Sequence, residues 1–525
     1  MAADARARAL VDRLVADLAP LEAEVNEAWW QTNVASSPEA DAKRIALEQR
    51  LSDYYADADA FAELSAVAAE GVGDETLARS VETLRLAFAA EQTPAELRTE
   101  MVTLNVECDS IYATFRGEAG GRRWNDNEIE KVLSHSADGD ERRAAWEASK
   151  QVGAEVHDRV MRLVGLRNAA AHRLGYPNFY AMSLALGELS EERLFALLDE
   201  LERLTAEPFA ALKADLDAKL RARFGVDDVM PWHYADPFFQ DAPPDLSVDL
   251  DPLVAGKDLT ELTLRTFEGL GLDLRAVAER SDLFTREGKN QHAFCIPVDR
   301  EGDVRVLCNV IDSERWASTM LHEFGHAAYD SNLDAGLPWP VRRVAHLLTT
   351  EGVAQLFGRL SKDASWLRDV AGVPAADLVG VDEQVAAALR AHMLVFARWV
   401  LVMCHFERGL YADPAADHDT RWWDLVERFQ LVTRPPGRTA PDWAAKLHLA
   451  LAPVYYQNYV LGELFASQMQ ATVEARGGKL YDDRETGEWL RRSVFEPGAR
   501  LRWDRLIEEA TGEPISAKAF AKQFV

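Results

Sequence analysis

The stretch Leu321-His322-Glu323-Phe324-Gly325-His326 decides how this chain is interpreted. In a helix, residues four apart project from the same face, so His322 and His326 can bind one metal ion from consecutive turns. Glu323 then lies beside that ion and can act as a general base on a water molecule. The alternative is a core helix whose two histidines are hydrogen-bonded and chemically idle.

A third ligand follows in the next predicted helix, which covers residues 349–357. Glu351 lies there among apolar residues, and a carboxylate in such surroundings needs a partner. The loop at 336–340 contains a glycine and two prolines, so it can end the first helix and let the second return antiparallel to it. The sequence therefore predicts a Zn²⁺ site at His322, His326 and Glu351, and the third ligand favours this interpretation over idle histidines.

The composition argues against several other classes of protein. The chain has 525 residues, of which 48% are hydrophobic and 28% charged, as is ordinary for a globular protein. Its formal net charge is −29, so we expect no nucleic-acid partner and no binding to an anionic membrane surface. No stretch approaches the roughly twenty uninterrupted apolar residues of a membrane helix. The N-terminus lacks the apolar core of a secretion signal, so a cytoplasmic protein is expected. The oligomeric state stays open.

Helical periodicity dominates the chain, and the predicted fold class is mainly α. Long helices are expected near residues 4–30, 190–224 and 376–409. The one clear strand pattern lies at 293–298 and 304–310, so a single small, peripheral antiparallel sheet is expected.

The two predicted strands carry further expectations. Pro297 places the first strand at a sheet edge, where it could pair with an extended peptide or form a plain structural hairpin. Cys295 and Cys308 lie on these strands and could face each other, although in a reducing cytosol they are expected as small buried thiols.

Two other segments suggest how the chain is organised. The glycine-containing stretch 117–123 is expected to be a flexible break that separates an N-terminal helical layer, residues 1–116, from a body, residues 117–525. The proline- and aromatic-rich segment 230–251 is irregular, and it either lines a cleft or crosses the surface packed by its own aromatic side chains.

A second set of polar residues lies about a hundred residues after the first. Lys446 and His448 are followed by Tyr456 and Tyr459, which are three apart and share a face if they are helical. Hydrolysis of a carbonyl group needs donors for the oxyanion, and Tyr O–H and His N–H groups serve that purpose. A packed aromatic helix is the alternative, which the upstream zinc motif disfavours.

These motifs resemble the gluzincin peptidases, closest to the angiotensin-converting enzyme family and its bacterial dipeptidyl carboxypeptidase relatives. The thimet oligopeptidase family shares the same architecture. The matching patches are Trp29-Trp30-Gln31-Thr32-Asn33-Val34, the strand around Cys295, the run from Cys308 to His326, His322-Glu323-Phe324-Gly325-His326 with Glu351, and Lys446-x-His448 with Tyr456 and Tyr459.

The resemblance implies an elongated, two-lobed helical ellipsoid with a deep central cleft, lidded by N-terminal helices and forming one catalytic domain over residues 1–525. It implies that His448 and Tyr459 stabilise the transition state. It implies that Lys446 and Tyr456 hold the C-terminal carboxylate of a peptide. His233 falls roughly where the family has a glutamine for that same carboxylate.

The chain departs from the family pattern at three places. Gln355 stands where the family has an acidic residue that orients a zinc histidine. The spacing from His448 to the tyrosines is one residue longer, so an insertion must be absorbed near Pro453. Asn458 replaces an arginine tied to chloride activation, so chloride dependence is not implied. The motif His-Glu-Phe-Gly-His is more similar to that of the thimet oligopeptidase family.

The sequence thus predicts a zinc peptidase that acts on oligopeptides and releases C-terminal dipeptides. Glu323 is expected to take the proton of the attacking water and deliver it to the leaving amine. An oligoendopeptidase of the thimet type is the first alternative. A peptide-binding protein on the same fold, without catalysis, is the second.

Overall fold

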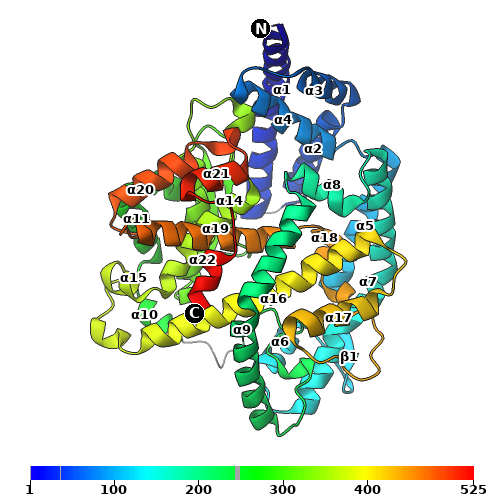
Figure 1. Ribbon diagram of the computed structural model, residues 1–525, viewed down its shortest axis with the longest axis vertical. Coiled ribbons are helices and arrows are strands. Elements are labelled where there is room, and N and C mark those ends of the chain that lie inside the picture. Colours follow the sequence, from blue (N-terminus) through cyan, green and yellow to red (C-terminus); the bar gives the residue numbers. More distant parts are fainter. Residues whose placement is uncertain (1, 36, 243–248, 525) are drawn as a thin grey trace. The chain divides into compact units, whose positions relative to one another are not determined.

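The computed structural model describes residues 2–35, 37–242 and 249–524. Helices make up most of this part of the chain, with only short strands between them (Figure 1). The predicted mainly α fold class is therefore confirmed. The part of segment 230–251 that covers residues 243–248 lies outside the described residues.

The described chain divides into two compact units that interleave in the sequence. Unit 1 comprises residues 1–92, 249–382 and 461–519, and unit 2 comprises 93–248, 383–460 and 520–525. The expected boundary near residue 116 falls inside unit 2 rather than between the units. The single catalytic domain over the whole chain, its elongated shape and its central cleft stay predictions.

Each unit is built mainly of helices. Unit 1 contains α1 (Ala2–Val34), α2 (Pro38–Tyr55), α3 (Ala58–Glu70), α4 (Glu75–Ala90), α10 (Asp251–Val254), α11 (Leu259–Gly269), α12 (Arg275–Arg280), α13 (Glu314–Ser331), α14 (Leu347–Gly358), α15 (Ala364–Asp369), α20 (Arg484–Leu490) and α21 (Trp503–Thr511). Unit 2 contains α5 (Ala95–Thr114), α6 (Asp126–His135), α7 (Gly139–Arg173), α8 (Phe179–Leu186), α9 (Glu191–Phe224), α17 (His418–Gln430) and α18 (His448–Leu451). The helices α16 (Val381–Ala412), α19 (Tyr456–Ala475) and α22 (Lys518–Ala521) cross a boundary in the sequence.

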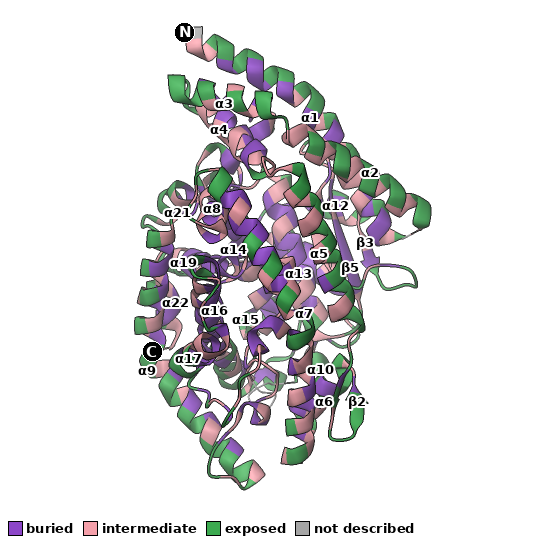
Figure 2. Cartoon of the chain, turned by 90° about the vertical axis from the view of Figure 1, so that its right-hand side faces the viewer, coloured by how far each residue is buried: buried purple, intermediate pink, exposed green. Residues whose placement is uncertain are grey.

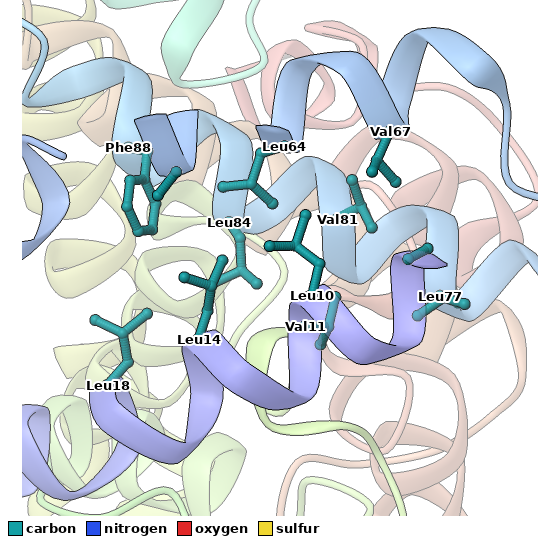
Figure 3. Close-up of a cluster of buried hydrophobic side chains, with 12 residues drawn as sticks. Leu10, Val11, Leu14, Leu18, Leu64, Val67, Leu77, Val81, Leu84 and Phe88 are labelled. Carbon is teal, nitrogen blue, oxygen red and sulfur yellow. The ribbon is translucent and has the colours of Figure 1, made fainter. Parts of the chain in front are cut away.

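The N-terminal helices of unit 1 form their own apolar core. The leucines at positions 10, 14 and 18 recur at helical spacing, so α1 presents one buried stripe. Leu64 of α3 and Phe88 of α4 belong to the same cluster, as Figure 3 shows. Burial of this stripe fixes α1, α3 and α4 against one another.

The sheet prediction was wrong in two respects. The strands β4 (Phe294–Pro297) and β5 (Val304–Val310) form the expected antiparallel pair, with β4 at the edge. A third strand, β3 (Asp282–Phe284), pairs with β5 in parallel, so this sheet is mixed. In addition, β1 (Gly117–Ala119) and β2 (Arg122–Trp124) form a separate hairpin where a flexible break was expected.

The central strand β5 is the buried part of the three-stranded sheet (Figure 2). Cys308 on β5 is fully buried and Cys295 on β4 is partly buried, and both are free thiols. The register pairs Cys295 with Val306, so the two cysteines are not directly opposite each other.

One described helix, α16, is long and apolar enough to cross a membrane by length and composition. However, 61% of its most apolar window is buried inside the protein, as in the core helix of a globular domain. A single helix of this kind is weak evidence for a membrane span. The expectation that no membrane is involved stays a prediction.

Candidate metal centre and peptide-binding residues

Helices α13 and α14 carry the predicted metal ligands and pack closely in unit 1. The Ser313 hydroxyl accepts a hydrogen bond of 3.3 Å from the Trp316 N–H, which caps the start of α13. Gly325 faces Ala354, and His322 faces Gly358. Because later residues on one helix meet earlier residues on the other, the two helices run antiparallel.

A glycine makes this close approach possible. A Cβ atom added to Gly325 would lie 2.9 Å from the Cα atom of Ala354, which is too close for any side chain. Gly462 of α19 approaches α14 from another side, since its added Cβ would lie 3.0 Å from the Cβ of Glu351. The backbone of α14 is therefore held between two helices, and the position of Glu351 follows from that packing.

The three predicted ligands converge. Donor atoms of His322, His326 and Glu351 all lie within 4.8 Å of one another. The Nε2 atom of His322 is 3.8 Å from a carboxylate oxygen of Glu351, and the two imidazole centroids are 4.9 Å apart. Donors that share one zinc at about 2.1 Å can be no more than about 4.2 Å apart, so small side-chain rotations would complete the set. Two imidazoles and one carboxylate fit zinc in number and kind.

A hydroxyl group that the sequence reasoning missed orients one of these ligands. The Oγ1 atom of Thr350 lies 2.6 Å from Nδ1 of His326. This contact fixes the imidazole ring and leaves Nε2 for a metal ion. Thr350 directly precedes Glu351 in the sequence, but the family pattern places the orienting group at position 355, where Gln355 stands.

Burial prepares the histidines as neutral ligands. It lowers the pKa of His322 to about 4 and that of His326 well below its ordinary value, in the latter case with the charge of His322 adding to the effect. Both imidazoles are therefore uncharged at neutral pH, which is the form that binds a metal.

Burial has the opposite effect on the two carboxyl groups. It raises the pKa of Glu351 to about 7. Burial, together with the negative charge of Glu351, raises the pKa of Glu323 to about 8. Glu323 is 8% exposed, so it lies in the protein interior beside the ligands, as a general base for this site should.

The second predicted set of residues also clusters, within unit 2. The ring centroids of His448 and Tyr456 are 4.8 Å apart, and those of Tyr456 and Tyr459 are 5.6 Å apart. The Nζ atom of Lys446 lies 5.8 Å from the centre of the Tyr456 ring. Burial lowers the pKa of His448 to about 4, with Lys446 contributing, so its imidazole is neutral. Its Nδ1 atom is buried without a hydrogen-bond partner among the described residues.

Gln240 is a further residue of this cluster that the sequence reasoning missed. The Nζ atom of Lys446 donates a hydrogen bond of 2.7 Å to Oε1 of Gln240. The resemblance implied a glutamine that binds the same substrate carboxylate as the lysine, and Gln240 is a glutamine in contact with that lysine. Segment 230–251 was predicted to be irregular, but no motif distinguishes Gln240 within it.

His233, which was predicted for that role, instead makes contacts within its own local structure. It is 4% exposed, its Nδ1 accepts a hydrogen bond of 2.8 Å from the N–H of Met230, and its ring stacks on Phe224. Burial lowers its pKa to about 4. These contacts serve the local fold and give no support to substrate binding by His233.

A cavity of about 550 Å³ lies next to Lys446 and Gln240 in unit 2. Residues 235–238 and 240–242 of the irregular segment are among the residues that line it. Aromatic side chains of Tyr112, Phe115 and Trp124 and carboxylates of Asp126, Glu130, Asp236 and Asp241 contribute to its walls. The volume suits an amino-acid side chain or a small ligand.

Comparison with known proteins addresses the first part of the chain. Residues 1–231 match the family model of angiotensin-converting enzyme. The chain is also 26% identical over 259 residues to Thermostable carboxypeptidase 1 of Thermus thermophilus. That alignment covers 44% of this chain and 50% of the relative, so the chain spans about half the length of the curated relative it matches.

The resemblance to the angiotensin-converting enzyme family is thus confirmed, and both findings support a peptidase. The family match ends before the metal-binding motif begins, so the motif adds its own evidence.

Proposed function

We propose that this chain is a zinc-dependent peptidase that hydrolyses short peptides and releases their C-terminal dipeptides. The observation that carries the proposal is the convergence of His322, His326 and Glu351, with the buried carboxyl group of Glu323 close enough to feel the charge of Glu351. A zinc ion bound by these three ligands would polarise the peptide carbonyl and lower the pKa of the attacking water.

The side chains of the protein perform the proton transfers. Glu323, ionised by the positive charge of a bound metal ion, would accept a proton as the water oxygen attacks the carbonyl carbon. The same carboxyl group then delivers the proton to the amine nitrogen as the C–N bond breaks. His448 and Tyr459 are proposed as N–H and O–H donors to the oxyanion, which suits the neutral imidazole of His448.

Lys446 and Gln240 are proposed to bind the C-terminal carboxylate of the peptide, with Tyr456 as a further donor. Lys446 already donates to Gln240, so a carboxylate could replace that contact with a charge-assisted one. The adjacent cavity would receive the C-terminal side chain. Oligopeptides are therefore the proposed substrates, zinc the proposed cofactor and the cytoplasm the proposed location.

The products distinguish this proposal from its alternatives. We expect mass spectrometry of a defined nonapeptide to show loss of C-terminal dipeptides, and amidation of its C-terminus to abolish turnover. Release of single residues would fit a carboxypeptidase, as the name of the relative describes. Unchanged cleavage of the amidated peptide would fit an oligoendopeptidase of the thimet type.

Replacement of the proposed general base separates an enzyme from a peptide-binding protein. Glu323→Gln is expected to lower kcat by about 10²–10⁴-fold, because general-base catalysis contributes that much. The zinc content should remain that of the wild type, since Glu323 is not a ligand. Full activity of Glu323→Gln would remove the proposed mechanism, and absence of activity in both proteins would favour a binding function.

A further inference from the structure

The backbone of Val454 has a conformation that its side chain disfavours. Its φ angle is +56°, in the left-handed region, and its side chain is branched at Cβ. Such a residue is strained, because Cβ approaches the backbone carbonyl. Val454 lies in the short connection between α18 and α19, at the place where the one-residue insertion was expected.

Two buried side chains hold both peptide groups of Val454. Its N–H donates a hydrogen bond of 2.7 Å to Oε1 of Glu407 on α16. Its carbonyl oxygen accepts a hydrogen bond of 2.6 Å from the side-chain amide of Gln457. Glu407 is 2% exposed and Gln457 is 3% exposed, so water does not replace these contacts.

The preceding helix is held in a similar way. The guanidinium of Arg167 on α7 is buried and donates to the carbonyl oxygens of Leu449 and Ala450, near the end of α18. It also donates to the hydroxyl of Tyr411, on the same helix as Glu407. The connection from α18 to α19 is thus fixed at both ends by interior polar groups of unit 2.

The residues on either side of this connection are the proposed oxyanion and carboxylate donors. His448 begins α18, and Tyr456 and Tyr459 lie in the first turn of α19. A left-handed residue changes the direction of the chain between them, so its conformation sets how the tyrosine rings meet the imidazole. A shift of about 1 Å at such groups can reduce a rate by about a hundredfold.

We propose that Glu407 is a positioning residue, which holds Val454 in its left-handed conformation and thereby places Tyr456 and Tyr459 relative to His448. Its effect on turnover rests on the proposed peptidase function. Its effect on the connection itself does not.

Four variants test this. Glu407→Ala removes the acceptor and is expected to lower kcat/KM at least about tenfold. Glu407→Gln keeps a carbonyl acceptor and should stay within about threefold of the wild type. Val454→Gly removes the strain, since glycine adopts a positive φ freely. The double variant Glu407→Ala/Val454→Gly should therefore recover most of the activity that Glu407→Ala loses.

Hydrogen exchange of the same variants gives a readout that does not need activity. In Glu407→Ala, peptides covering residues 447–460 should exchange at least about tenfold faster, while peptides covering 314–331 should be unchanged. The double variant should regain protection. Equal loss in the single and double variants, or unchanged exchange over 447–460 in Glu407→Ala, would overturn the proposal. If the wild type showed no hydrolysis, the exchange pattern would still decide the role of Glu407.

Discussion

At the scale of single residues, the site depends on groups whose charge and orientation are set by burial. His322 and His326 are held neutral, and Glu323 and Glu351 have raised pKa values for the same reason. Thr350 adds the contact that fixes one imidazole. These effects need no long-range field, because each comes from a close neighbour or from the exclusion of water.

The hydroxyl of Thr350 gives the first prediction. Thr350→Val keeps the shape of the side chain but removes the contact with His326, so zinc affinity should fall about 10–100-fold. Thr350→Ser, which keeps a hydroxyl group, is the matched control and should bind zinc nearly as the wild type does. Competition with a chromophoric chelator measures both. Equal affinity of the valine variant and the wild type would show that the contact does not orient the ligand.

The pKa values give a second prediction, about protons released on metal binding. The carboxyl of Glu351 is protonated below about pH 7 in the metal-free protein, whereas the histidines are neutral above about pH 5. Zinc requires the Glu351 carboxylate, and its positive charge also favours ionisation of the neighbouring Glu323, whose pKa is about 8. Between one and two protons should therefore leave per zinc bound at pH 6, and the release should fall as the pH rises past about 8. The affinity should rise with pH over the same range. Calorimetry in buffers of different ionisation enthalpy measures this release, and zero release at pH 6 would contradict the assignment.

At the scale of elements, the site is a product of helix packing. Gly325 lets α13 meet α14, and Gly462 lets α19 approach the backbone beside Glu351. A histidine pair at i and i+4 is useful only if a carboxylate from a second helix reaches the same point. Because Gly325 of α13 and Gly462 of α19 both allow close contact with α14, the carboxylate of Glu351 is held near the two histidines.

Gly325→Ala tests this packing. The added methyl would lie 2.9 Å from the Cα atom of Ala354, so the helices must separate, which should cost about 1–3 kcal/mol of stability and weaken zinc binding. Gly165→Ala is the control, because a Cβ there meets nothing within 4 Å and alanine favours the helix. Urea denaturation and zinc titration measure both effects. A fully stable, fully zinc-binding Gly325→Ala would show that the close approach is not needed.

Some of the helices and strands could be predicted from the sequence, and others could not. The long helices and the pair β4–β5 follow from periodicity over many residues, which is why their existence was predictable. β3 has only three residues and pairs in parallel with a distant strand, so nothing local marks it. β1 and β2 are equally short, and the glycines of their turn were interpreted as a flexible break.

The candidate site shows the same limit for side chains. His322, His326 and Glu351 were predictable because metal ligands must recur at fixed helical spacing. Gln240 contacts Lys446, and Thr350 contacts His326. Both are tertiary contacts, which no regular spacing in the sequence predicts. His233 was selected by an approximate alignment, and its ring proves to be engaged with Met230 and Phe224.

At the scale of the whole molecule, charge is the property with functional consequences. The chain carries a net charge of −29, and four carboxylates line the cavity beside Lys446. The carboxylates would attract a peptide whose last side chain is basic, and they would repel one whose last side chain is acidic. The aromatic side chains of the cavity wall would accept apolar side chains as well.

A series of peptides that differ only in the last residue tests this. Peptides ending in Lys or Arg should have kcat/KM values at least about tenfold above those ending in Asp or Glu, and the gap should narrow in about 1 M salt. The double replacement Asp126→Asn/Glu130→Gln should also reduce this difference in kcat/KM. A peptide that ends in citrulline, the neutral analogue of Arg, is the uncharged control. Equal rates for all endings would show that the cavity does not receive the side chain.

The central claim is that one zinc ion is bound by His322, His326 and Glu351. The most direct measurement is an anomalous difference map from crystals of the zinc-loaded protein, collected at the zinc absorption edge. We predict one strong peak at about 2.0–2.2 Å from a ring nitrogen of each histidine and a carboxylate oxygen of Glu351. A map without a peak among these three side chains, or with its strongest peak on other ligands, would contradict the claim.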